Sequence, residues 1–179
     1  IFGFATLDGD QSKWMRSPRY QLRGTLTGID QAESYEVIRL AFESWNEVSG
    51  SSFQATEGGQ NSEIEFTLTN SWPEEFGENA AGVTLTYRNQ GVLSAAEIYL
   101  NGQNFEWTTS VPVGSSDSFR LSDIQGVATH EIGHALGLTH SFYRPATMFY
   151  SGGEFALRTL DEDDIRGLRY LYGGLQAGQ

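Results

Sequence analysis

The three histidines of the chain all lie in one short segment, His130–His140. His130 and His134 stand four positions apart, so on a helix both imidazoles project from the same face. Gly137 can adopt a left-handed conformation that ends the helix, and His140 would then approach from another direction. Three imidazoles with one open position are typical of catalytic zinc, because structural zinc sites are usually closed by four protein ligands. The spacing therefore predicts one catalytic zinc ion.

Glu131 follows the first of these histidines and could supply acid–base chemistry. A bound zinc ion lowers the pKa of water from roughly 16 toward about 7. Glu131 could then accept the water's proton as general base and later pass it to a leaving amine. The alternative for Glu131 is an exposed salt bridge, which is common for charged helix residues. Short HExxH matches also occur by chance, with the histidines at ordinary surface or core positions, but the longer pattern favours zinc.

Composition limits the classes of protein to which the chain can belong. A length of 179 residues with 39% hydrophobic residues suits one folded domain, which we place at residues 1–179. The net charge of -12 disfavours binding to nucleic acid or to anionic membranes. No cysteine is present, which excludes disulfides and a thiolate nucleophile. Because no apolar run reaches the length of a membrane span, we expect no membrane insertion.

Hydrophobic periodicity predicts a mixture of strands and helices. Residues 19–27, 63–69, 82–87 and 97–100 have the alternation or the apolar content of strands. Apolar residues recur at helical spacing over 35–48, which predicts a long amphipathic helix. We therefore expect an α+β domain in which one twisted sheet is backed by two helices.

Capping residues predict where the helices begin. Asp30 suits the start of the first helix. Ser122 with Gln125 predicts a capping box for the helix that carries the histidines. Asp161 can cap a final helix, which Gly173 and Gly174 would end.

Three motifs occur together in the second half of the chain. They are HEIGHALGLTHS at residues 130–141, Met148 within ATMFY, and DDIRGLRYLYG at residues 163–173. Together these motifs resemble those of metzincin metalloproteases. Ser141 after the third histidine and the DDI…LYG ending are similar to the matrixins, the matrix-metalloproteinase-like catalytic domains. The resemblance covers nearly the whole chain.

The resemblance implies a fold and a role for three further residues. The fold is α+β and metzincin-like: one twisted, mostly parallel sheet with an antiparallel edge strand, two long helices behind it and a C-terminal helix. Met148 is implied to form the Met-turn beneath the zinc ligands, while its alternative is ordinary core filling. Of Asp163 and Asp164, one is implied to anchor the N-terminal ammonium and the other to brace the Met-turn. Their alternative is the common preference for acids at a helix N-terminus.

The resemblance also implies a polypeptide substrate that adds a strand to the edge of the sheet. Gly82, Val83 and Thr84 match that edge strand. The loop after Met148, with Phe149, Tyr150 and Ser151, would form a wall of the main specificity pocket. We expect an apolar pocket and therefore a bulky hydrophobic residue just after the scissile bond.

The chain departs from the vertebrate matrixins at its other metal sites. No histidine is left for a second, histidine-bound zinc. The calcium-binding acids after the fifth strand are replaced by NGQNFE at residues 101–106. Calcium could still bind at Glu74, Glu75 and Glu78, although a solvated charged surface is the alternative.

The overall prediction is a secreted, monomeric zinc endopeptidase that is made with an N-terminal propeptide. Two alternatives stay open: a catalytically idle peptide-binding module on the same fold, and a zinc amidohydrolase that acts on non-protein amides. The complete ligand set and Glu131 argue against the first alternative. The edge strand and the Met148 motif argue against the second.

Overall fold

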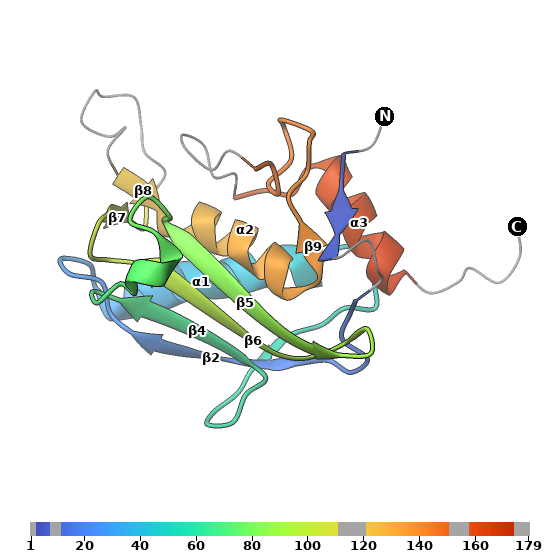
Figure 1. Cartoon of the computed structure of the whole chain (residues 1–179), viewed down its shortest axis with the longest axis horizontal. Helices are drawn as coiled ribbons and strands as arrows, with labels where there is room; N and C mark the ends of the chain where they lie inside the picture. The colour runs from blue at the N-terminus through green and yellow to red at the C-terminus, as the bar shows by residue number, and fades with distance from the viewer. Residues whose placement is uncertain (1–2, 8–11, 111–120, 151–157, 174–179) are drawn as a thin grey trace, which may run out of the picture.

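A five-stranded sheet with helices packed on one of its faces forms the body of the molecule (Figure 1). The structure is a computed structural model, and it describes residues 3–7, 12–110, 121–150 and 158–173. The strand order is β3-β2-β4-β6-β5. The strands are β2 (Arg19–Gly24), β3 (Thr56–Glu57), β4 (Ile64–Thr69), β5 (Gly82–Asn89) and β6 (Val92–Asn101).

The sheet is parallel except at one edge. β2 pairs in parallel with both β3 and β4, and β4 pairs in parallel with β6. β5 runs antiparallel to β6 and leaves its other side unpaired within the described residues. The predicted mostly parallel sheet with an antiparallel edge strand is therefore confirmed.

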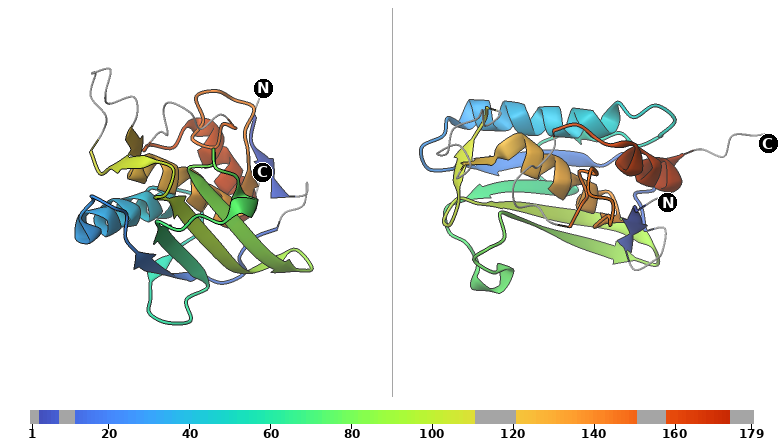
Figure 2. Two further views of the ribbon diagram at one scale, coloured as in Figure 1. Left: turned by 60° about the vertical axis from the view of Figure 1, so that its left-hand side comes forward. Right: turned by 90° about the horizontal axis from the view of Figure 1, so that it is seen from above.

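Two helices, α1 (Gln31–Asn46) and α2 (Ile124–Ala135), pack against each other on the same face of the sheet (Figure 2). Asp30 caps α1 by accepting a hydrogen bond from the N–H of Glu33, as the sequence predicts. The indole N–H of Trp45 on α1 donates to the carbonyl of Thr129 on α2 at 2.9 Å. This buried hydrogen bond fixes how the two helices pack.

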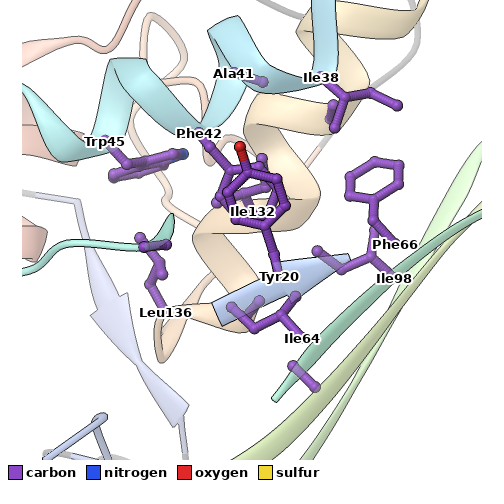
Figure 3. Close-up of a cluster of buried hydrophobic side chains, with 14 of the residues drawn as sticks. Tyr20, Ile38, Ala41, Phe42, Trp45, Ile64, Phe66, Ile98, Ile132 and Leu136 are labelled. Atoms are coloured by element: carbon purple, nitrogen blue, oxygen red, sulfur yellow. The ribbon is translucent and has the colours of Figure 1, made fainter. Parts of the chain in front are cut away.

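The core lies between α1, α2 and the sheet (Figure 3). β4 alternates as predicted: Ile64, Phe66 and Leu68 are buried, and the residues between them face the other side. Tyr20 of β2 stacks on Phe42 of α1 with ring centroids 3.8 Å apart. Burial of these apolar side chains fixes the position of the helices on the sheet.

The β5–β6 hairpin is longer than the sequence predicts. Its connection is only Gln90 and Gly91, both with positive φ values of 50° and 76°. That conformation matches the right-handed twist of hairpin strands. Residues 92–96, which the sequence does not assign to the strand expected at 97–100, therefore belong to β6.

Short elements complete the fold. β1 (Ala5–Thr6) pairs antiparallel with β9 (Leu138–Thr139), beside the final helix α3 (Glu162–Tyr172) (Figure 1). β7 (Glu106–Thr108) pairs with β8 (Leu121–Asp123), and η2 (Glu74–Phe76) is a 3-10 turn. Asp161 caps α3 with a capping box that includes Asp164, as predicted for Asp161. Gly174, the second expected stop residue, lies outside the described residues.

The predicted cap of α2 is wrong by one position. Asp123, not Ser122, is the N-cap, and its carboxylate accepts from the N–H groups of Gln125 and Gly126. Ser122 is a strand residue that pairs with Trp107. Arg158 binds both carboxylate oxygens of Asp123 at 2.7 Å, a long-range contact that a local motif cannot reveal.

In the part of the chain that the structure describes, no helix has the length and apolar character needed to cross a membrane.

Candidate active site

The three histidines converge on a single point. His134 Nε2 lies 3.1 Å from His130 Nε2 and 3.2 Å from His140 Nε2. Tetrahedral ligands at the usual Zn–N distance of about 2.0–2.1 Å would stand about 3.3 Å apart. These imidazoles are therefore spaced as ligands of one zinc ion.

The other ring nitrogens establish which atoms would bind the metal. His130 Nδ1 lies 2.7 Å from the carbonyl oxygen of Thr147, and His134 Nδ1 lies 2.9 Å from that of Leu138. A carbonyl can only accept, so each Nδ1 carries the proton and each Nε2 presents a lone pair. Lone pairs this close repel each other unless a cation lies between them. The donor set therefore fits zinc, and Thr147 and Leu138 orient two of its ligands.

The surroundings favour the neutral form of His134 and His140, the form in which an imidazole binds a metal. Burial, together with the neighbouring His130 and His140, lowers the pKa of His134 to about 3. Burial and His130 also lower the pKa of His140.

Backbone geometry brings His140 to the other two ligands. Gly137 has a φ of 103°, which turns the chain at the end of α2 as predicted. A side chain there would also clash with the carbonyl of Ser12. After this turn, β9 pairs with β1, and His140 follows directly. The N-terminal strand thus supports the segment that carries the third ligand.

Glu131 is buried between α2 and the edge strand β5, with only 7% of its surface exposed. The Thr84 hydroxyl donates to Glu131 Oε2 at 2.6 Å. A Cβ atom added to Gly82 would lie 2.9 Å from Oε1, so this glycine leaves space for the carboxylate. Burial raises the pKa of Glu131, while His130 and the Thr84 hydrogen bond oppose that rise.

Met148 is buried beneath the same helix. Its side chain packs so closely on Gly133 that a Cβ there would clash with the sulfur. Its carbonyl accepts from the N–H of Ser141 at 2.6 Å. Met148 therefore contacts α2 between the two helical histidines and is also joined to the residue after His140.

Asp164 binds the backbone at Met148. Its carboxylate accepts from the N–H groups of Thr147 at 2.8 Å and Met148 at 3.0 Å. It also accepts from the N–H of Asp161 at 2.8 Å. Burial raises the pKa of Asp164, and the three N–H donors oppose that rise. Asp164 thus connects α3 to the turn whose Thr147 carbonyl orients His130.

Asp163 connects α3 to the N-terminal segment. It accepts from the N–H of Gly3 at 2.7 Å and from the Ser141 hydroxyl at 2.7 Å. In this sequence the Gly3 nitrogen is an amide and not an ammonium, because Ile1 and Phe2 precede it.

The residues expected to contact substrate belong to two separate segments of the chain. Gly82, Val83 and Thr84 belong to the edge strand β5. Tyr150 is 61% exposed and packs against Phe149 with ring centroids 4.5 Å apart. Ser151, expected in the same pocket wall, lies outside the described residues.

Several residues at the site were not predicted from the sequence. Thr84 was expected to contribute only its backbone, and Gly133 and Leu138 were given no role. Gly133 and Leu138 lie inside the motif at residues 130–141, but its spacing does not show that Gly133 leaves room for Met148 or that the Leu138 carbonyl binds His134. Thr84 contacts Glu131 from a distant segment, 47 positions earlier in the chain. The mixed sheet, its two backing helices and the converging histidines define a metzincin-type zinc metalloprotease domain.

Comparison with known proteins agrees with this class. The matrixin family model matches residues 13–173, so the chain belongs to the matrixin family, which is zinc-dependent. The chain is 32% identical over 165 residues to the hatching enzyme of Paracentrotus lividus, covering 89% of this chain and 26% of that protein. It is 26% identical over 183 residues to the macrophage metalloelastase of Oryctolagus cuniculus, covering 100% and 37%.

A plant protein is similar to the same extent. Identity to the metalloendoproteinase 5-MMP of Arabidopsis thaliana is 32% over 152 residues, covering 79% of this chain and 40% of the plant protein. The chain therefore spans about a quarter to two fifths of the length of these relatives.

Proposed function

We propose that this chain is a zinc-dependent endopeptidase that hydrolyses internal bonds of polypeptides. The observation that carries the proposal is the convergence of three imidazole nitrogens, at 3.1 and 3.2 Å, together with the buried carboxylate of Glu131, which follows His130 on the same helix. That set of groups combines a metal site with a base, as peptide hydrolysis at neutral pH requires.

His130, His134 and His140 would hold the zinc ion through their Nε2 atoms. When bound, zinc supplies a Lewis acid that polarises the scissile carbonyl and lowers the pKa of water. Glu131 Oε1, the oxygen that Thr84 does not engage, would accept the water's proton. The same carboxyl group would then deliver the proton to the departing amine nitrogen.

The edge strand β5 supports a polypeptide substrate. Its unpaired side offers backbone groups at Gly82, Val83 and Thr84, to which an extended peptide could add as a further strand. This strand also contacts Glu131. A peptide bound there would therefore lie next to the proposed base.

The expected specificity pocket includes Tyr150 and Phe149. Both are aromatic, which supports a preference for a bulky hydrophobic residue just after the scissile bond. The proposal also retains secretion, a monomeric state and an N-terminal propeptide, which rest on resemblance to the family.

For Glu74, Glu75 and Glu78 we propose a solvated charged surface. All three are exposed, and among the described residues the histidines form the one group of at least three metal-ligating side chains whose ligand atoms converge. Calcium remains a secondary expectation, because its sites draw largely on backbone carbonyls.

Cleavage of internally quenched peptides tests the proposal. The zinc-loaded chain should cleave them, a chelator should abolish cleavage, and added zinc should restore it. Mass spectrometry of the products should place a bulky hydrophobic residue after the cut. If peptides bind but stay intact, the binding-module alternative is favoured. If only non-protein amides are hydrolysed, the amidohydrolase alternative is correct.

A further inference from the structure

We propose that the hydroxyl of Thr84 is a positioning group for the general base: it holds Glu131 so that Oε1 stays available for proton transfer. This inference rests on the proposed peptidase function and adds one residue to its machinery. Thr84 lies on the edge strand, 47 positions before Glu131. Its contact with Glu131 is therefore created by the fold and not by a local motif.

The hydrogen-bond geometry favours the carboxylate as the acceptor. Thr84 Oγ1 lies 2.6 Å from Glu131 Oε2 and 3.0 Å from the backbone carbonyl of the same residue. A hydroxyl has a single proton, and a bond to an ionised oxygen is shorter and stronger than one to a neutral carbonyl. The proton therefore points at Oε2, which leaves Oε1 without this donor.

Glu131 needs such a partner because its own torsions do not fix the carboxylate. The terminal torsion of a glutamate side chain is broad, so rotation about it is inexpensive. Among the residues that the structure describes, Thr84 is the one donor to this carboxylate. Its hydrogen bond therefore selects the orientation.

The strand itself is shaped for this contact. Alternate residues of a strand face the same side, so Gly82 and Thr84 both face Glu131. A Cβ atom at Gly82 would lie 2.8 Å from Glu131 Cγ and 2.9 Å from Oε1. Gly82 thus leaves room for the carboxylate while Thr84 binds it.

The position of Thr84 is fixed by its neighbour in the sheet. Thr84 pairs with Ile98 of β6, and Ile98 is fully buried in the core. The hydroxyl is therefore presented from a rigid element. A peptide that pairs with β5 would bind the strand that carries Gly82 and Thr84, so the same strand would position both the substrate and the base.

The test compares two variants of Thr84 with a matched control. Thr84→Val keeps the shape and the β-branch but removes the hydroxyl, whereas Thr84→Ser keeps the hydroxyl. Thr86→Val is the control, because Thr86 lies on the same strand and side, and its hydroxyl makes no hydrogen bond within the described residues. For each zinc-loaded protein, kcat and KM are measured on a quenched peptide, together with zinc content and Tm.

Thr84→Val should lower kcat by about tenfold with KM nearly unchanged, since a hydrogen bond to a charged group is lost. Thr84→Ser should restore most of kcat, and Thr86→Val should match the wild type. In a Glu131→Gln background, Thr84→Val should cause no further loss. A crystal structure of zinc-loaded Thr84→Val should show Glu131 in more than one orientation.

Other outcomes overturn the inference. If Thr84→Val retains full kcat, changes only KM, or leaves Glu131 in a single unchanged orientation, Thr84 does not position the base. Equal losses in the serine and valine variants would indicate a packing role instead. These results leave the proposed peptidase function intact. If the wild-type chain cleaves no peptide, the proposed function fails, and the role of Thr84 fails with it.

Discussion

The side chain of Met148 lies directly against the backbone of Gly133, in the turn of α2 between His130 and His134. The contact is so close that any side chain at position 133 would meet the sulfur. Met148 is also held by Asp164 through its N–H and by Ser141 through its carbonyl. The helix that carries two ligands thus rests on a turn that α3 holds in place.

Gly133→Ala should therefore disturb the zinc site without changing a ligand. The added methyl group overlaps Met148 and also approaches Trp45 Cζ2 at 3.0 Å. Overpacking of this kind costs about 1–3 kcal/mol of stability. Zinc affinity, measured by competition with a chromophoric chelator, should fall together with Tm. The cost should shrink when Met148→Ala is added, and equal costs in both backgrounds would contradict the contact.

Asp164→Asn should be more damaging than its small change in shape suggests. Both carboxylate oxygens accept from backbone N–H groups, which cannot reverse their role. An amide would place its NH2 group against one of these donors, at a cost of about 2–3 kcal/mol. Urea unfolding measures this loss. The control is Glu162→Gln, because its exposed pair with Arg166 is worth less than about 0.5 kcal/mol. Similar stabilities for the two variants would refute the bracing role.

Asp163→Asn should cost less, about 1 kcal/mol. One of its two donors is the Ser141 hydroxyl, which can turn to accept from an amide, while the Gly3 N–H can still bind the amide oxygen. Deletion of residues 1–3 should have a similar effect on Tm, because it removes the other donor. If neither change alters stability or peptide cleavage, Asp163 does not anchor the N-terminal segment.

The sequence was most informative where short-range spacing decides the structure. The separation of His130 and His134 on one helix and the turn at Gly137 predict the converging ligands. The alternation in β4 predicts its buried face, and the Asp30 and Asp161 caps predict two helix starts. In each case the residues that decide the structure lie within a few positions of one another, so their spacing in the sequence is enough to predict the local geometry.

Contacts between distant segments could not be predicted in this way. The N-cap of α2 is Asp123 and not the predicted Ser122. Ser122 pairs with β7 as part of β8, and Arg158, which is distant in the sequence, binds the Asp123 carboxylate. The contact of Thr84 with Glu131 depends on how β5 meets α2. Such contacts depend on the register and packing of whole elements, which no local pattern records.

The most direct test of the whole account is a comparison of zinc content and turnover for the wild-type chain and Glu131→Gln, measured on the same preparations. Glutamine keeps the size of the side chain but cannot accept the proton, and general acid–base catalysis contributes about 10²–10⁴-fold to rate. The account predicts one zinc ion per chain in both proteins, with kcat lowered by at least about 100-fold in the variant. Equal peptide cleavage by the two zinc-loaded proteins would contradict it.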